Sequence, residues 1–258
     1  MLEGCVMRLT VMLFFAVFLF LAGGCRSFSE EISASDISID ELEKRMQQAM
    51  DPNGRFARAR SYVMRQQVTT DRSWMDLPEV QMVEVKFSAP DRFKLTTYTD
   101  NEPEQMIIAN GSEGWFVNLD SKKVIRLDRQ KLESVLMMAR LTNPGTPLKK
   151  VFRKVAVDRS RIDDEDFYRI TCFREKNTPI YIYVGCKDFF SKRLRMTMGI
   201  PGSRMDYDSR MLNYSMYEGV MIPGESIVYQ GSMEQKSKVI YYKLDVEFDD
   251  KEFRVPLF

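Results

Sequence analysis

The chain of 258 residues contains no histidine. This absence excludes serine–histidine and cysteine–histidine catalytic pairs, histidine-ligated zinc and an imidazole proton shuttle. The chain also lacks an excess of either charge, because 38 lysine and arginine residues are matched by 37 acidic ones. Binding to phosphates needs a concentrated basic face, and no basic stripe runs through the sequence. We therefore expect no nucleic-acid partner.

Cysteine is scarce, with four residues in all. Two lie in the N-terminal segment, so only Cys172 and Cys186 are left to pair. In a predicted hairpin of residues 167–174 and 180–186, Cys172 faces roughly Ile182, and Cys186 is about four positions out of register. A disulfide needs Cα atoms within about 7 Å, so we expect two unpaired buried thiols. A disulfide remains the alternative, because exported proteins meet oxidising conditions.

One long apolar run lies near the N-terminus, from Leu9 to Leu21. It follows Arg8, and it leads into Leu21-Ala22-Gly23-Gly24-Cys25. At about 1.5 Å per residue, a helix of this length is too short for a hydrocarbon core of about 30 Å. It fits the apolar region of an export signal. The small residues before Cys25 resemble a bacterial lipoprotein signal, in which cleavage precedes a cysteine lipidated on its thiol. An uncleaved membrane anchor is the alternative.

This resemblance implies a signal peptide at residues 1–24 and lipidation of Cys25. Residues 25–38 are expected to be the lipidated N-terminus and a tether, because Phe28–Asp36 is polar and rich in Ser and Glu, which predicts a mobile segment. The resemblance places the rest of the chain in the cell envelope, held to a membrane by the N-terminal lipid. Arg26 follows the cysteine, where the enterobacterial sorting rule would require aspartate for retention at the inner membrane. The expected location is therefore the periplasmic face of the outer membrane.

Residues 39–258 are expected to form one domain with two helices. Asp40 is the predicted N-cap of a helix over residues 41–50, with Glu43 completing a capping box. A second helix is predicted over residues 129–141, where an apolar stripe recurs at helical spacing. The stripe comprises Leu132, Val135, Leu136 and Ala139.

The rest of the domain alternates with period two between turns rich in Pro, Gly, Asn and Asp, which predicts an antiparallel meander. So many strands with only two helices imply one strongly curved sheet. We expect an α+β, mostly β fold: an incomplete β-barrel of about ten or eleven strands, with helices covering its concave face. Strands are predicted within residues 59–69, 80–87, 92–98, 106–109, 114–119, 124–127, 149–157, 166–174, 180–186, 192–198, 211–217, 226–230 and 239–248.

Side-chain directions follow from the alternation of a strand. The last predicted strand shows it most clearly, with an apolar face made of Ile240, Tyr242, Leu244, Val246 and Phe248. Trp115 and Phe116 point to opposite sides of their strand, so we expect one of them to face the interior.

Three segments resemble the LolA/LolB superfamily. The first is VEVKFSAPDRFKL at Val83–Leu95, and the second is IIANGSEGWFVN at Ile107–Asn118, followed by Lys123-Val124. The third is the closing segment at residues 244–256. The family pattern is a strand, a turn with proline and phenylalanine, a second strand, a hairpin with tryptophan, a return strand and a C-terminal tail.

The resemblance implies an apolar cavity for the acyl chains of lipids or lipoproteins, without catalytic residues, metal or cofactor. Burial would drive binding at about 0.8 kcal/mol per methylene. Together with Cys25, it implies a receptor or lipid carrier fixed at the membrane rather than a shuttling carrier. In the soluble carriers an arginine before the turn proline is implicated in closing the lid. Ala89 occupies that position here, so the resemblance does not imply such a lid.

We expect two sets of side chains to line this cavity. Any single methionine favours ordinary core packing, but the 18 methionines of the chain together suit an adaptable apolar surface. The sheet contributes Val83, Val85, Phe93, Trp115, Leu244 and Val246, and the helix contributes the lid stripe of Leu132, Val135, Leu136 and Ala139.

Two other functions remain open at this point. A regulatory or envelope-assembly module on the same scaffold would fill the cavity with its own side chains and bind an envelope protein. A carbohydrate-active enzyme would need two carboxylates that are close in space, which a sequence does not reveal. The acidic run Asp163–Asp166 is expected to be a solvated turn rather than a metal or acid–base site.

Overall fold

The protein is represented by a computed structural model that describes residues 30–70, 80–141, 147–173, 179–200, 203–231 and 233–258. Within these residues, 14 strands form one antiparallel sheet in the order β1-β8-β9-β10-β11-β12-β13-β14-β2-β3-β4-β5-β6-β7. The sheet is open, since β1 and β7 are its two edges. The expected mostly β architecture is confirmed, with more strands than the ten or eleven predicted.

The bounds of the elements follow the predicted meander closely. The strands are β1 (Glu30–Ala34), β2 (Ser61–Thr70), β3 (Val80–Ser88), β4 (Arg92–Thr99), β5 (Glu102–Asn110), β6 (Glu113–Asn118), β7 (Lys123–Arg126), β8 (Lys154–Ile162), β9 (Glu165–Phe173), β10 (Ile180–Gly185), β11 (Ser191–Ile200), β12 (Ser203–Tyr217), β13 (Val220–Gln230) and β14 (Met233–Leu244). The helices are α1 (Ile39–Met50), α2 (Arg55–Arg58), α3 (Arg129–Leu141) and α4 (Leu148–Val151), with a 3₁₀ turn η1 (Asp250–Phe253).

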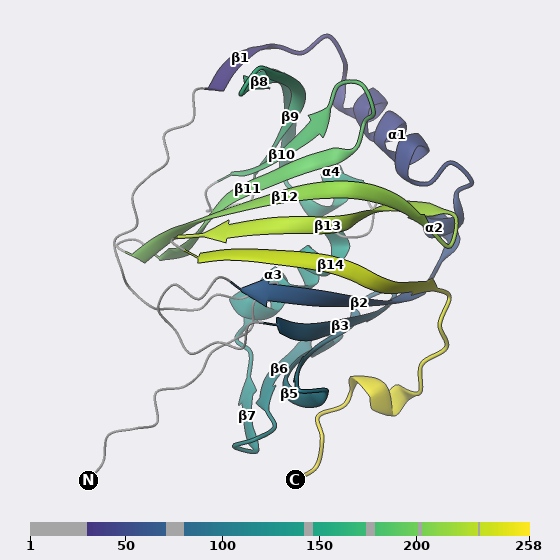
Figure 1. The fold of residues 1–258 in the computed structure, drawn as a ribbon, viewed down its shortest axis with the longest axis vertical. Coiled ribbons are helices and arrows are strands. Elements are labelled where there is room, and N and C mark those ends of the chain that lie inside the picture. The colour runs from purple at the N-terminus through teal and green to yellow at the C-terminus, as the bar shows by residue number, and fades with distance from the viewer. Residues whose placement is uncertain (1–29, 71–79, 142–146, 174–178, 201–202, 232) are drawn as a thin grey trace.

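One long-range pairing joins two meanders into one sheet, and a second adds an edge strand. Strands β2–β7 and β8–β14 each pair with their neighbours in sequence, and β14 then pairs with β2 while β1 pairs with β8. Figure 1 shows the sheet curling from β8–β10 at the top to β5–β7 at the bottom, with α3 and α4 behind its middle strands. None of the described helices is both long and apolar enough to span a membrane.

The inner face of the sheet holds two hydrophobic cores. The first core lies on β2–β6, β13 and β14, and Leu132, Val135 and Ala139 of α3 pack into it. The second core lies on β8–β13 and receives Leu42 of α1 and Leu148 of α4. Helix α3 thus covers the apolar face of the first half of the sheet, while α1, α4 and Met137 of α3 cover that of the second half.

The start of α1 differs from the prediction. The helix begins at Ile39, and its N-cap is Ser38, whose hydroxyl accepts a hydrogen bond from the Glu41 N–H at 3.3 Å. Asp40 instead forms an ion pair with Lys149, and Glu43 accepts a hydrogen bond from the Leu148 N–H at 2.6 Å. Both acids therefore link α1 to the start of α4 rather than capping α1.

The predicted mobile tether is wrong for residues 30–34, which form the edge strand β1 beside β8. Polar contacts hold this strand in place. Glu30 accepts a hydrogen bond from the Ser160 hydroxyl at 2.8 Å and forms an ion pair with Arg169 at 3.4 Å. Just beyond the strand, Asp36 pairs with Arg159 at 3.0 Å. The described part of the domain therefore includes residues 30–38, which were predicted to be tether.

Three further differences concern short or irregular segments. Residues 149–151, predicted as the start of a strand, belong to α4 (Leu148–Val151). Residues 203–210, for which no strand was predicted, belong to the long β12. In β14 the register with β2 shifts between Val239 and Tyr241, so Val239 is buried in the first core while Ile240 is 50% exposed.

Candidate functional site

Helix α3 and the inner face of the sheet meet in an apolar interface. Leu132, Val135 and Ala139 of the lid stripe are buried in the first core, and Leu136 packs against it half-buried. Asp128 accepts a hydrogen bond from the Lys131 N–H at 2.9 Å and so caps the helix, and this bond lowers the pKa of its carboxyl. The predicted helix and its orientation are confirmed.

The close approach of α3 to the sheet depends on a glycine. A Cβ atom at Gly114 of β6 would lie 2.8 Å from Cδ1 of Leu132, which is closer than carbon atoms can pack. Glycine at this position therefore lets the first turn of α3 rest directly on β6.

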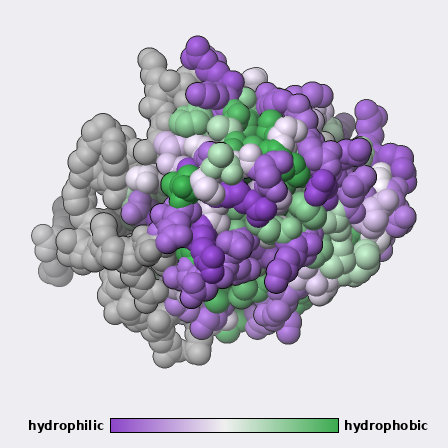
Figure 2. All heavy atoms as spheres, turned by 90° about the horizontal axis from the view of Figure 1, so that it is seen from above, coloured by the Kyte–Doolittle hydropathy of each residue, from purple (hydrophilic) through white to green (hydrophobic). Residues whose placement is uncertain are grey.

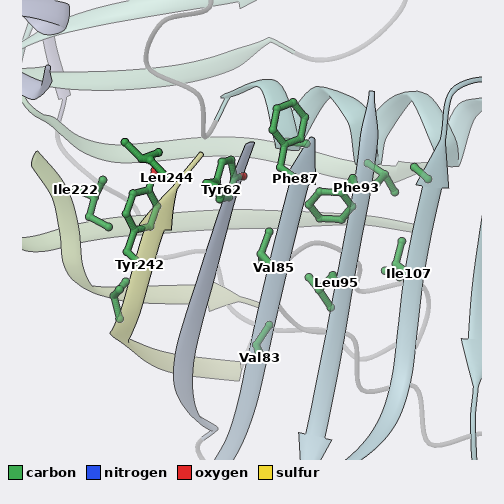
Figure 3. Close-up of a cluster of buried hydrophobic side chains, with 14 of the residues drawn as sticks. Tyr62, Val83, Val85, Phe87, Phe93, Leu95, Ile107, Ile222, Tyr242 and Leu244 are labelled. Atoms are coloured by element: carbon green, nitrogen blue, oxygen red, sulfur yellow. The ribbon is translucent and has the colours of Figure 1, made fainter. Parts of the chain in front are cut away.

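The sheet contributes two apolar rows of side chains that run across neighbouring strands. Tyr62 of β2 stacks between aromatic side chains of the two adjacent strands. Its ring centroid lies 5.5 Å from that of Phe87 on β3 and 5.9 Å from that of Tyr242 on β14. Figure 3 shows the aromatic and aliphatic side chains on one side of these strands. In order of pairing, the first row is Leu244, Tyr62, Phe87, Phe93, Ala109 and Gly114, and the second is Tyr242, Met64, Val85, Leu95, Ile107 and Phe116.

The next rows along the same face mix valines of the first core, Val68, Val83 and Val239, with polar but uncharged residues, and we call these polar residues the polar belt. Its members are nearly inaccessible, with exposed fractions of 0–9%. Gln235 donates to Thr70 Oγ1 at 3.0 Å, and Gln105 donates to Glu104 at the edge of the belt at 3.1 Å. The belt comprises Gln66, Thr70, Gln81, Thr97, Gln105, Gln230, Gln235 and Ser237.

Four atoms of the belt have no hydrogen-bond partner among the described residues. They are Gln66 Oε1, Gln81 Nε2, Thr97 Oγ1 and Gln230 Nε2. A buried polar group without a partner costs about 1–3 kcal/mol. Such groups are expected to meet ordered water or a ligand, so this part of the inner face differs in kind from the two apolar rows beside it. Sequence reasoning missed the belt because alternation alone did not distinguish polar from apolar interior positions.

Most predicted cavity residues lie together in the first core. Val83, Val85, Phe93 and Leu244 are all buried there beside the lid stripe. Trp115 is different: on β6 it points to the opposite face, and the neighbouring Phe116 packs against the core instead. Val246 lies beyond the end of β14, half-buried, where its carbonyl accepts a hydrogen bond from Ser61 at 2.7 Å. The structure thus brings eight of the ten residues together.

The outer face of β3 and β4 is covered by the C-terminal segment through ion pairs. Lys86 bonds Glu84 at 3.0 Å and Glu252 at 2.8 Å, and Lys94 also bonds Glu252, at 3.0 Å. Burial favours the neutral form of Glu84, but hydrogen bonds from Arg65 and Lys86 outweigh it and hold the pKa of its carboxyl below the ordinary 4.5. Phe253 of η1 is fully buried, with its ring 5.4 Å from that of Phe248.

The two cysteines that follow the N-terminal segment were predicted to be unpaired and buried. Cys172 and Cys186 are free, as expected, and Cys172 pairs with Ile180 rather than Ile182 across the hairpin. Burial raises the pKa of the Cys172 thiol to about 12, while Cys186 is only half-buried and accepts a hydrogen bond from Arg159 at 2.7 Å. In the described part of the chain, no group of three His, Cys, Asp or Glu residues is placed to hold a metal. Cys25 lies outside the described residues.

No protein-family model and no curated protein matches the sequence. Solved structures do match the fold. A LolA superfamily protein from Nitrosomonas europaea superposes with a TM-score of 0.58 at 16% identity, over 85% of this chain and 98% of that one. A DUF1329 family protein from Desulfovibrio piger gives 0.56 at 10% identity, over 84% and 95%. A putative outer membrane lipoprotein-sorting protein domain from Vibrio parahaemolyticus gives 0.54 at 8% identity, over the same shares. The chain therefore has a LolA-like fold.

Proposed function

We propose that this protein is a lipoprotein of the cell envelope, fixed to a membrane through Cys25, that binds acyl chains of lipids or lipoproteins between α3 and the inner face of its sheet. The observation that carries the proposal is the pair of apolar rows that run unbroken across six strands beneath one amphipathic helix. The LolA-like fold supports it, because one protein of that fold is described as a lipoprotein-sorting domain.

Binding requires α3 to move. The first-core residues are at most 9% exposed, so in the described conformation the side chains of the lid stripe occupy the surface that an acyl chain would cover. Burying a leucine contributes about 1.5–3 kcal/mol, and each buried methylene of a ligand contributes about 0.8 kcal/mol. Some three methylenes therefore offset the loss of one leucine contact, and a long acyl chain offsets the whole stripe. No covalent chemistry is part of this proposal.

The test is the lipid content of the full chain purified from bacterial membranes. Native mass spectrometry should show bound lipid besides the lipid attached to the protein, and the protein should take up a fluorescent fatty acid. Leu136→Gln, which makes the half-buried lid position polar, should reduce uptake severalfold. Leu212→Gln, at an exposed position on β12, should leave it unchanged. Repeated purification without bound lipid and without uptake would contradict acyl binding.

A second candidate is a regulatory or envelope-assembly module on the same scaffold. The tight burial of the first core favours it, because such a module keeps its interior filled by its own side chains. The same purification separates the two functions. A lipid-free protein that is repeatedly recovered with one envelope protein would support the module, whereas recovery with exchangeable lipid would support acyl binding.

A further inference from the structure

We propose that Gln66, Gln81 and Thr97 form a subsite for the uncharged polar end of the ligand, where acyl chains join a head carrying carbonyls and at least one N–H or O–H. This inference rests on the proposed acyl binding and assigns the ligand's polarity and orientation. It begins with the geometry of the polar belt. Gln66 and Thr97 both pair with Val83, from β2 and β4 respectively, and Gln81 lies two residues before Val83 on the same face of β3.

The three side chains carry complementary hydrogen-bond donors and acceptors. Gln66 Oε1 accepts hydrogen bonds, Gln81 Nε2 donates them and the Thr97 hydroxyl does both, and none has a partner among the described residues. Their side chains are 7%, 4% and 1% exposed, so they are removed from bulk water. A ligand that satisfies all three must itself both donate and accept. An ester or amide linkage with a hydroxyl or N–H does so, whereas a bare carboxylate only accepts.

The electrostatic setting favours a neutral head. The inward positions of β2, β3, β4, β13 and β14 hold no charged side chain in the described residues. A charge buried there would lose its hydration without a counter-charge. At the edge of the belt, the Glu104 carboxylate accepts hydrogen bonds from Thr99 and Gln105, and its charge would repel an anionic head.

The polar belt follows the apolar rows along the same strands, and this arrangement determines the orientation of the ligand. Along β3 the inward residues run from Phe87 and Val85 to Val83 and Gln81, a rise of about 20 Å from first to last. Acyl chains that lie under α3 against the apolar rows therefore place their linkage region among the three polar side chains. Two sources share this chemistry: a glyceride and the N-acylated diacylglyceryl cysteine of a lipoprotein.

The test uses membranes that contain the full chain and three photoreactive probes with the same 16-carbon chain. The probes are the fatty acid, its monoglyceride and a triacylated cysteine peptide. The double variant Gln66→Leu with Thr97→Val removes two polar contacts at nearly constant volume. Its matched control, Gln67→Leu with Thr96→Val, alters the adjacent residues, which point to the other face of the same strands.

We expect the wild type and the control to capture the monoglyceride or the peptide about tenfold more than the fatty acid. The double variant should capture all three probes about equally while keeping fatty-acid capture. The more strongly captured neutral probe identifies the source. A preference that survives in the double variant, a wild type that prefers the fatty acid, or a folded double variant that loses every probe would each overturn the subsite. If the wild type captures none of the probes, acyl binding fails as well.

Discussion

Glu84 shows how a single acid can hold part of this fold together. Its side chain is 4% exposed, yet it remains paired with Arg65 at 2.6 Å and Lys86 at 3.0 Å on the outer face of the sheet. Arg65 is more than half exposed, so water screens its share of the interaction. The hydrogen bonds to a buried carboxylate remain, and removing such a bond typically costs about 1–3 kcal/mol.

This pairing predicts a pH dependence. Because the folded-state pKa of Glu84 is lowered, its contribution is present above the ordinary value of 4.5 and is lost as the pH falls through the folded-state pKa. Glu84→Gln should lower the free energy of unfolding by about 1–3 kcal/mol at pH 7 and make its decline below pH 5 less steep. Urea denaturation between pH 3 and 7 measures both. Glu102→Gln, at an exposed position, serves as the control, and equal pH profiles for the wild type and Glu84→Gln would contradict the prediction.

At this scale the sequence predicts side-chain direction only while the alternation of a strand is unbroken. The register shift near Val239 reverses the direction of Ile240, and no residue type there announces it. Between Trp115 and Phe116, both large and aromatic, period two predicts opposite faces but not which one is inward. Contacts between distant strands decide that, and they exist only in the assembled sheet.

Among the elements, the C-terminal segment covers part of the outer face of the sheet, as α3 covers part of the inner face. Phe253→Ala should destabilise the protein by about 3–5 kcal/mol, because it empties a fully buried site of a large side chain. Phe258→Ala, at a residue that is 55% exposed, should change stability little. Thermal and urea denaturation of the two variants measure the difference. Equal stabilities would show that packing of the C-terminal segment does not stabilise the sheet.

Helix α3 is predicted to act as a lid that must open. A Cβ atom at Gly114 would lie 2.8 Å from Cδ1 of Leu132, so cysteines at these two positions are predicted to form a disulfide that locks the helix onto β6. The oxidised double variant should lose fatty-acid uptake, and reduction should restore it. Each single cysteine variant controls for the substitution itself. Equal uptake by the locked and reduced forms would show that chains enter by another route.

Which elements the sequence reveals depends on their amphipathicity. Helix α3 and strands β2–β4 carry clear apolar periods and appear near their predicted bounds. Strand β1, with the sequence EEISA, has no such period and is held by its pairing with β8 and by the ion pair between Glu30 and Arg169, which are distant in sequence. Helix α4 spans only four residues, too few for a helical period to be distinguished from alternation.

For the whole molecule, the order of strands follows largely from hairpins that are local in sequence, which is why the curved meander was predictable. The two pairings that complete the sheet, β14 with β2 and β1 with β8, join residues more than a hundred positions apart. Turn residues carry no information about such pairings. The sequence therefore predicts the class of fold but not which strands form its edges.

The membrane attachment is predicted to depend on one residue. Cells that express the full chain should incorporate labelled palmitate into it, and mass spectrometry should place the mature N-terminus at Cys25. Cys25→Ala should abolish the label and leave residues 1–24 attached, because the lipoprotein peptidase requires the modified cysteine. A label that survives this substitution, or an N-terminus elsewhere, would contradict the assignment.

Strand β1 also limits how far such an anchored domain can travel. If lipid is attached at Cys25, at most five residue steps separate it from Glu30, the first residue of the sheet, a span of about 18 Å at full extension. The first strand would stay within about 18 Å of the lipidated cysteine, so the domain could not carry cargo across the periplasm. The molecules that deliver or receive the lipid would have to come to the domain, and every transfer of lipid would take place at the membrane surface.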